Sequence, residues 1–136
     1  MSQLPSEKGF IVNQLPAILC ALFIFVGSSI PGKDFPDLGI FSYDKIIHFS
    51  AYLVLTFLTY RALRYQNRVR FLSNNAHWIA LLFAIGYGAI DELHQSFVPG
   101  RDADPYDWIA DSAGSLVCLL AVSRWTSLFP GKDRST

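Results

Sequence analysis

The sequence predicts an all-α, polytopic membrane protein: a bundle of four transmembrane helices. Three observations lead to this fold class. Hydrophobic residues make up 51% of the 136-residue chain, charged residues make up only 16%, and the apolar residues form four long stretches. A soluble domain carries about 25% charged residues, and a chain this short would need them to cover its surface. Lipid removes that requirement, because the surface that faces hydrocarbon is apolar.

Each apolar stretch is close to the ~20 residues that a helix needs to cross ~30 Å of hydrocarbon. The first contains no charged residue and ends at Pro31, and the later three are separated by short polar segments. The first stretch has an alternative interpretation as a cleaved signal peptide, with Lys8 as its charged start and Gly27-Ser28-Ser29 as its cleavage region. The four stretches cover residues 11–30, 44–63, 76–95 and 105–125.

The charges are distributed unequally between the two ends of these predicted helices. If the termini, residues 65–75 and the helix ends that border them share one side, that side holds eight Lys and Arg against two acids, a net charge of +6. The other side holds three Lys and Arg against nine acids, a net charge of −6. The excess of Lys and Arg marks the cytoplasmic side. We therefore expect cytoplasmic tails at 1–10 and 127–136 around a transmembrane domain at 11–126.

Composition also excludes some classes of protein and site. The formal net charge is zero, whereas a nucleic-acid-binding domain carries a basic excess, so we expect no nucleic-acid partner. Cys20 and Cys118 both lie inside apolar stretches and have no CxxC spacing. We interpret both as small buried hydrophobic residues.

The second predicted helix begins at the outer face with a run of polar residues. Asp44, His48 and Tyr52 are spaced four residues apart and therefore share one face of the helix. Lys45 lies beside them. This stripe points from the membrane interface into the bundle.

The third predicted helix ends at the same face with Asp91, Glu92 and Gln95. Asp91 and Gln95 are four residues apart and share a face. The preceding turns carry Ala84 and Gly88, a small-xxx-small pair that suits close contact between helices. The end of this helix is therefore expected to pack closely and to carry acids inward.

The loop and the fourth predicted helix add further charges. A Pro-Gly turn at 99–100 is expected to place Arg101 over the helix ends, and Asp104 is expected to cap the fourth helix. Asp107 and Asp111 share a face of that helix. Because a charge facing hydrocarbon costs roughly 3 kcal/mol, these residues should turn toward one another.

The result is a predicted polar cluster at the outer end of the bundle. Ionisable residues at membrane depth favour a functional site, although a buried ion network that holds the bundle together is the alternative. The expected binding residues are Asp44, Lys45, His48, Glu92, Gln95, Arg101, Asp107 and Asp111. The catalytic candidates are His48, Asp91 and Glu92.

The pattern of these residues resembles that of the VanZ-like family of bacterial membrane proteins. One departure is Asp111, where the family pattern often has Asn. The resemblance implies a multi-pass protein of the bacterial inner membrane that acts in the cell envelope, in a family associated with resistance to the glycopeptide antibiotic teicoplanin. The matching pieces are Asp44-Lys45-x-x-His48-x-x-x-Tyr52, Asp91-Glu92-x-x-Gln95-x-Phe97-x-Pro99-Gly100-Arg101, and Asp107 followed by Gly114.

Three functions are compatible with this cluster. In the first, Lys45, Arg101 and the helix starts bind a phosphate or carboxylate of a lipid or a lipid-linked cell-wall precursor. In the second, His48 and a carboxylate perform acid/base catalysis on such a lipid. The third, an ion pathway, ranks last because the cytoplasmic halves of the helices look apolar.

Enzyme activity stays open at this stage. The chain contains no serine nucleophile elbow, HExxH motif or phosphate-binding loop. His48, His94, Asp91 and Glu92 together could bind a divalent ion, but their spacing matches no metal motif. We therefore expect neither a metal ion nor another cofactor.

Overall fold

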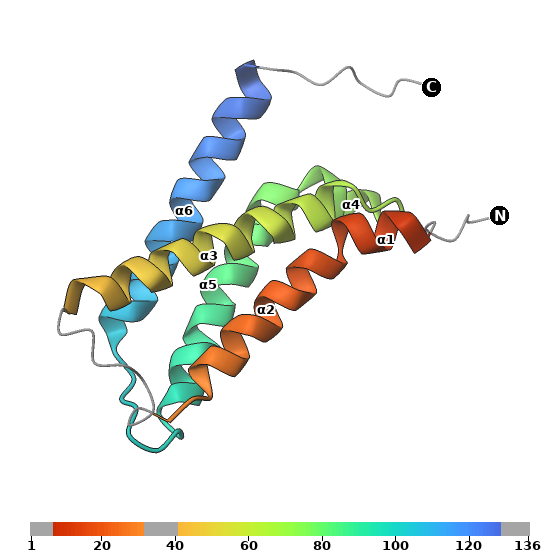
Figure 1. Ribbon diagram of the computed structural model, residues 1–136. Helices are drawn as coiled ribbons and strands as arrows, with labels where there is room; N and C mark the ends of the chain where they lie inside the picture. Colours follow the sequence, from red (N-terminus) through yellow and green to blue (C-terminus); the bar gives the residue numbers. More distant parts are fainter. Residues whose placement is uncertain (1–6, 32–40, 129–136) are drawn as a thin grey trace, which may run out of the picture.

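The computed structural model describes residues 7–31 and 41–128 (Figure 1). Its regular secondary structure in these ranges is entirely helical, which confirms the all-α prediction. The predicted outer loop at 32–40 and most of both predicted tails lie outside the described residues. The helices are α1 (Glu7–Asn13), α2 (Leu15–Ser28), α3 (Phe41–Arg64), α4 (Arg70–Asn74), α5 (Ala76–Gln95) and α6 (Pro105–Leu128).

Three of the four predicted helices are present nearly as expected. α5 has the predicted limits, α3 begins three residues earlier, and α6 extends three residues further. Two expectations were wrong. The predicted helix at 11–30 is divided into α1 and α2, and the segment at 65–75 contains the short helix α4.

The break between α1 and α2 follows from a proline in the first turn of α2. Pro16 has no N–H group to donate to the carbonyl of Val12, four residues earlier. The guanidinium of Arg61 donates a hydrogen bond to that carbonyl instead. Gln14, at the break, donates from Nε2 to the carbonyl of Ala62 at 3.3 Å. These two bonds hold the break against the last turn of α3.

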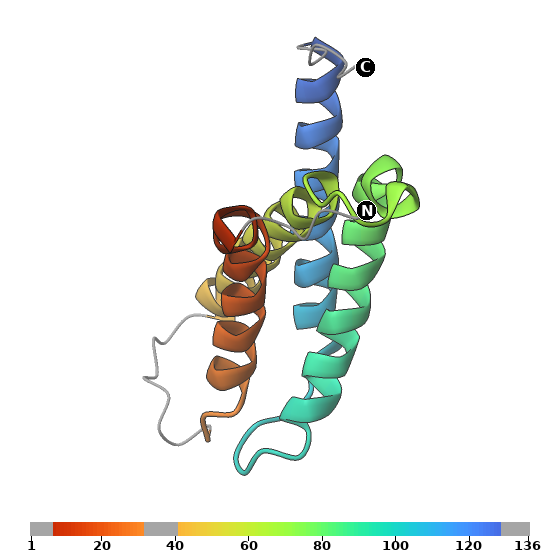
Figure 2. The ribbon, with the colours of Figure 1, turned by 90° about the vertical axis from the view of Figure 1, so that its right-hand side faces the viewer.

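α3 lies at the centre of the bundle and packs against α2, α5 and α6. Figures 1 and 2 show the end of α2, the end of α5 and the start of α6 gathered at one end of the molecule. The C-terminal half of α6 extends beyond the other helices in both views. At that end of the bundle, side chains from several helix ends can therefore contribute to one site.

The buried hydrophobic core of the bundle is small. Tyr52 and Leu55 of α3 pack with Ala84 of α5 in a buried cluster, and Cys20 of α2 packs against it. At Gly114 of α6, an added Cβ would lie 2.1 Å from the carbonyl oxygen of Phe49 in α3. The backbones of α3 and α6 therefore touch, as in membrane helix pairs that meet at small residues.

Two helices of the described chain are long and apolar enough to cross a membrane: α3 from Tyr43 to Arg64, and α5. Only 22% and 39% of their most apolar windows are buried within the molecule. A core helix of a soluble protein would be mostly buried, so this apolar surface faces outward. The structure thus supports two of the four predicted spans by length and composition, since α2 is shorter and α6 carries acids.

Candidate functional site

The Lys45 ammonium lies near the N-terminal end of α3 and joins α3 to the start of α6. It donates a 2.5 Å hydrogen bond to Asp104 and a second one to Asp107. Asp44 lies further away, at 3.9 Å. The hydrogen bond from Lys45 lowers the pKa of the Asp104 carboxyl below its ordinary value. Lys45 is therefore the cation of a compact group of acids.

His48 lies one turn deeper in α3 and contacts α6 at a second position. Its Nδ1 is 3.0 Å from Oδ1 of Asp111, and its Nε2 is 3.9 Å from carboxylate oxygens of Asp44 and Asp107. The Asp111 side chain is fully buried. Asp111 fits there because Gly88 leaves room, since a Cβ at Gly88 would lie 3.1 Å from Oδ2 of Asp111.

Glu92 brings α5 into the same group. It is 7% exposed, and its Oε2 accepts a 2.9 Å hydrogen bond from the backbone N–H of Asp104. One potential ligand atom from each of His48, Glu92 and Asp111 lies within 4.8 Å of the others. Three helices therefore each supply one ionisable side chain to one place.

Asp91 belongs to a separate branch of the polar cluster. Its Oδ2 accepts a 2.8 Å hydrogen bond from the Ser28 hydroxyl of α2 and a 3.4 Å bond from Gln95. Asp91 and Gln95 share a face as predicted. These bonds join Asp91 to α2 and to Gln95, so they do not bring this catalytic candidate to His48.

The loop between α5 and α6 adopts the predicted turn. Gly100 has a φ of 74°, and the N–H of Arg101 donates to the carbonyl of Val98 at 3.1 Å. This turn leaves the Arg101 side chain half-buried beside the helix ends. Asp104 caps α6 as predicted, because its Oδ1 accepts a 2.9 Å bond from the N–H of Tyr106.

Four buried oxygen atoms of the cluster have no hydrogen-bond partner among the described residues. They are Oδ1 of Asp91, Oε1 of Glu92, Oδ2 of Asp111 and the hydroxyl of Tyr52. Buried polar atoms are nearly always paired, so unpaired ones indicate a missing partner. Three of the four are carboxylate oxygens, which accept hydrogen bonds or coordinate cations.

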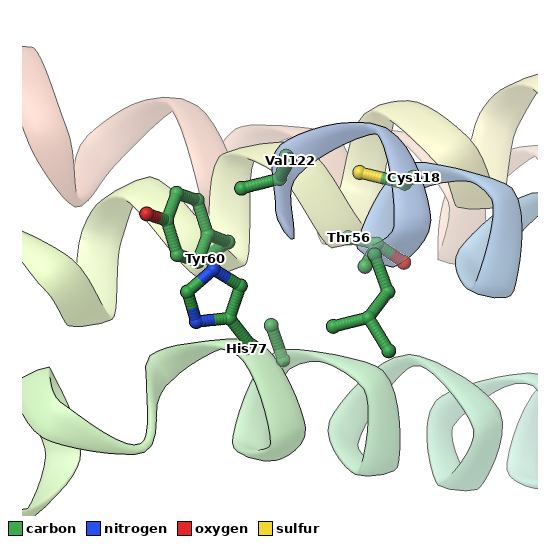
Figure 3. Close-up of a pocket in the computed structure, with 7 residues that line it drawn as sticks. Thr56, Tyr60, His77, Cys118 and Val122 are labelled. Carbon is green, nitrogen blue, oxygen red and sulfur yellow. The ribbon is translucent and has the colours of Figure 1, made fainter. Parts of the chain in front are cut away.

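A mainly apolar hollow lies between α3, α5 and α6, away from the polar cluster. It is shallow and is lined by side chains that include Tyr60, His77 and Cys118 (Figure 3). The rings of Tyr60 and His77 face each other with centroids 4.6 Å apart. The hollow contains no predicted site residue. Cys118 is 4% exposed and free, as expected for a small hydrophobic residue.

A comparison with protein families matches residues 14–126 to the family described as VanZ/LLP1. The chain belongs to the VanZ/LLP1 family. This match confirms the resemblance inferred from the sequence and covers every residue of the polar cluster. Neither a curated protein nor a solved structure matches the chain. Together, the VanZ/LLP1 match and the two apolar helices indicate a membrane protein.

Two residues of the VanZ/LLP1 cluster were missed by the sequence analysis. Ser28 was not assigned to the site, and Asp104 was expected only to cap the fourth helix. Both are held by contacts with distant residues, Asp91 and Lys45, over 59 positions or more along the chain. The available signal was their position, since both lie where a predicted helix meets the outer face.

Proposed function

We propose that this protein spans the bacterial inner membrane four times and recognises the polar head group of a lipid or lipid-linked cell-wall precursor at its outer polar cluster. The observation that carries this proposal is the convergence of charged side chains from α3, α5 and α6 inside an otherwise apolar bundle. Each of these charges would be costly in lipid, and a ligand-binding role is the usual reason for keeping them there.

The proposal of four spans is supported by the length of α1 and α2 together and by the outward face of α6. α2 has 14 residues and covers only ~21 Å, but α1 and α2 together run over residues 7–28 and approach the ~30 Å of hydrocarbon. α6 carries Asp107 and Asp111, which are 5% and 0% exposed, while Leu116 and Leu120 are exposed. Its acids therefore face the bundle, and its outward surface suits lipid.

The orientation follows from the distribution of charge at the two ends. Arg61 and Arg64 lie in the last turn of α3, Arg68 lies in the link to α4, and Arg70 begins α4. The acidic cluster occupies the opposite end of α3, at Asp44. The positive-inside rule then places both termini in the cytoplasm and the cluster at the outer leaflet.

The state of the cluster indicates which chemical groups it could recognise. Lys45 already bonds two carboxylates, and the Asp104 carboxylate already occupies the N-terminus of α6, so Lys45 and this helix start are less suited to bind an anion than the sequence suggested. Unpaired oxygens of Asp91, Glu92 and Asp111 favour a head group that donates hydrogen bonds. Sugar hydroxyls and amino groups of lipid-linked precursors have this property.

Binding to the full chain in nanodiscs tests the proposal. Native mass spectrometry would compare undecaprenyl-linked saccharides with phosphatidylethanolamine and phosphatidylglycerol. We expect Glu92→Gln to weaken binding of the preferred lipid about tenfold, since a lost charged hydrogen bond contributes 1.5–3 kcal/mol. Asp102→Asn, at an exposed loop position, is the matched control. Equal affinity of wild type and Glu92→Gln for every lipid would overturn the assignment of this site.

Enzyme activity on the same lipid is the second candidate. The observation in its favour is the 3.0 Å contact between His48 and Asp111, because a carboxylate that orients a histidine is a common acid/base arrangement. This candidate predicts a new lipid product that His48→Gln abolishes without abolishing binding. Lipid binding without any product over prolonged incubation would exclude the enzyme candidate and support lipid recognition only.

Action in the cell envelope is tested in cells. An alanine scan of Asp44, His48, Glu92 and Arg101 would score sensitivity to teicoplanin together with protein abundance. We expect loss of resistance at normal abundance for the site residues. Loss of abundance in every variant would instead show that the cluster holds the bundle together.

A further inference from the structure

We infer that His48, Glu92 and Asp111 form a binding site for one divalent transition-metal ion, of the Zn²⁺ or Mn²⁺ class. The sequence led us to expect no metal, and the four residues considered there were His48, His94, Asp91 and Glu92. The structure pairs His94 with Ser29 and Asp91 with Ser28, both in the segment that ends α2. It joins His48 and Glu92 to Asp111 instead.

The geometry of the three side chains is close to that of a metal site. Their potential ligand atoms, one imidazole nitrogen and two carboxylate oxygens, lie within 4.8 Å of one another. Ligands bound at about 2.0–2.2 Å from one Zn²⁺ lie ~3–4 Å apart, so rotamer-scale adjustments complete the site. Each ligand comes from a different helix, so the positions of the ligands are set by the packing of the bundle.

An independent observation points to a missing cation. Oε1 of Glu92 and Oδ2 of Asp111 have no hydrogen-bond partner among the described residues, and these residues are 7% and 0% exposed. A buried carboxylate oxygen without a partner costs free energy. A bound cation would remove that cost for both carboxylates at once.

The neighbouring charges favour an ion bound by His48, Glu92 and Asp111 over an ion bound by a second group of three side chains. Asp44, His48 and Asp107 also lie within 4.8 Å of one another. The Lys45 ammonium bonds Asp107, however, and would repel an ion placed there. The contacts described for Glu92 and Asp111 are with the Asp104 N–H and with His48, so a cation between them would meet carboxylate oxygens.

The ligand set selects the class of ion. One imidazole and two carboxylates suit Zn²⁺ or Mn²⁺ better than Ca²⁺ or Mg²⁺, which prefer all-oxygen sites. Three protein ligands leave at least one coordination position open. This use of the ion rests on the proposed function: an open position at the outer leaflet would hold a phosphate oxygen of a lipid head group despite the surrounding acids.

Metal analysis of the full chain tests the inference. Protein purified in detergent without chelator is analysed for metals, then stripped with EDTA and titrated with Zn²⁺ or Mn²⁺ by calorimetry. We expect one ion per chain, a higher thermal midpoint with the ion than without it, and affinity lowered at least about tenfold by Glu92→Gln. Asp102→Asn, in the neighbouring loop, should bind the ion as wild type does.

The outcomes separate the inference from a failure to fold. Glu92→Gln in EDTA should unfold at or above the temperature of stripped wild type, because it removes an unpaired buried charge. Metal-free protein whose thermal midpoint does not respond to either ion overturns the inference. Equal affinities of wild type and Glu92→Gln overturn it as well.

Lipid binding measured before and after EDTA separates the inference from the proposed function. Lipid binding that EDTA abolishes and Zn²⁺ or Mn²⁺ restores supports both. An ion that binds tightly to protein that binds no lipid supports the inference and removes the proposed function. Lipid binding of equal strength to metal-free protein keeps the proposed function and overturns the bridging role of the ion.

Discussion

Replacing Gly114 with alanine tests the close approach of α3 and α6, on which the polar cluster depends. The Cβ of the new residue would lie 2.1 Å from the carbonyl oxygen of Phe49, 2.9 Å from its carbonyl carbon and 3.2 Å from its Cα. All three atoms belong to backbone, so no side-chain rotation relieves the contact.

The size of the effect follows from these distances. Ordinary van der Waals contact begins near 3.4 Å, so the two helices must separate by about 1.3 Å at this point. Overpacking of this kind typically costs 1–3 kcal/mol, and the separation also loosens neighbouring contacts between α3 and α6. Because His48 and Asp111 lie across the same interface, we expect a loss of about 3 kcal/mol in the free energy of unfolding.

Gly86→Ala is the matched control. Gly86 also lies within a helix, but an added Cβ there meets no atom within 4 Å. Unfolding of both variants in detergent, followed by circular dichroism, should show destabilisation for Gly114→Ala. Gly86→Ala should be neutral or stabilising by up to about 1 kcal/mol, because alanine favours a helix over glycine. Equal stability of the two variants would refute the contact between α3 and α6.

Three further predictions concern single side chains of the cluster. Lys45→Met should lower the free energy of unfolding by about 3 kcal/mol, because Asp107 then stays buried without its cation, and Lys45→Arg should restore most of the loss in the same unfolding assay. Because the pKa of Asp104 is lowered in the folded protein, its contribution to stability is present above the ordinary Asp pKa and is lost as the pH falls through the lowered value. Carboxyl NMR should therefore show a titration midpoint for Asp104 below about 3.9, and an ordinary midpoint would contradict its bond to Lys45. Tyr52→Phe should leave stability unchanged or raise it by about 1 kcal/mol, because it removes a buried hydroxyl without a partner, and a clear loss would mean that this hydroxyl is paired.

The elements that depend on local chemistry were predictable from the sequence. α5 has the predicted limits because an uninterrupted apolar run lies between polar segments. The turn at 99–100 follows from the positive φ that glycine adopts readily, and the cap of α6 follows from a short acidic side chain before a proline. Such features need only neighbouring residues.

Features that depend on distant partners could not be read from the sequence. The break before α2 begins with Pro16, a local signal, but the Arg61 bond that accommodates it comes from α3. Asp91 and Glu92 are adjacent on α5, yet they face α2 and α6 respectively. Helical periodicity gives the angle between two side chains but does not identify the helix that each one faces.

The assignment of α6 shows a similar limit. Its acids make it too polar to qualify as a membrane span by composition, although Asp107 and Asp111 are buried against α3. Composition averages over all faces of a helix, whereas the cost in lipid depends on the exposed face alone. The proposed fourth span rests on this difference.

The most direct test of the central claim is the side of the membrane on which each end of the bundle lies. In a chain with Cys20 and Cys118 replaced by alanine, single cysteines at Asp102 and Asn67, both exposed, would be treated with a membrane-impermeant maleimide on intact cells. We predict labelling at position 102 in intact cells and at position 67 only after permeabilisation. Labelling of both positions from the same side would contradict a membrane bundle with its polar cluster at the outer face.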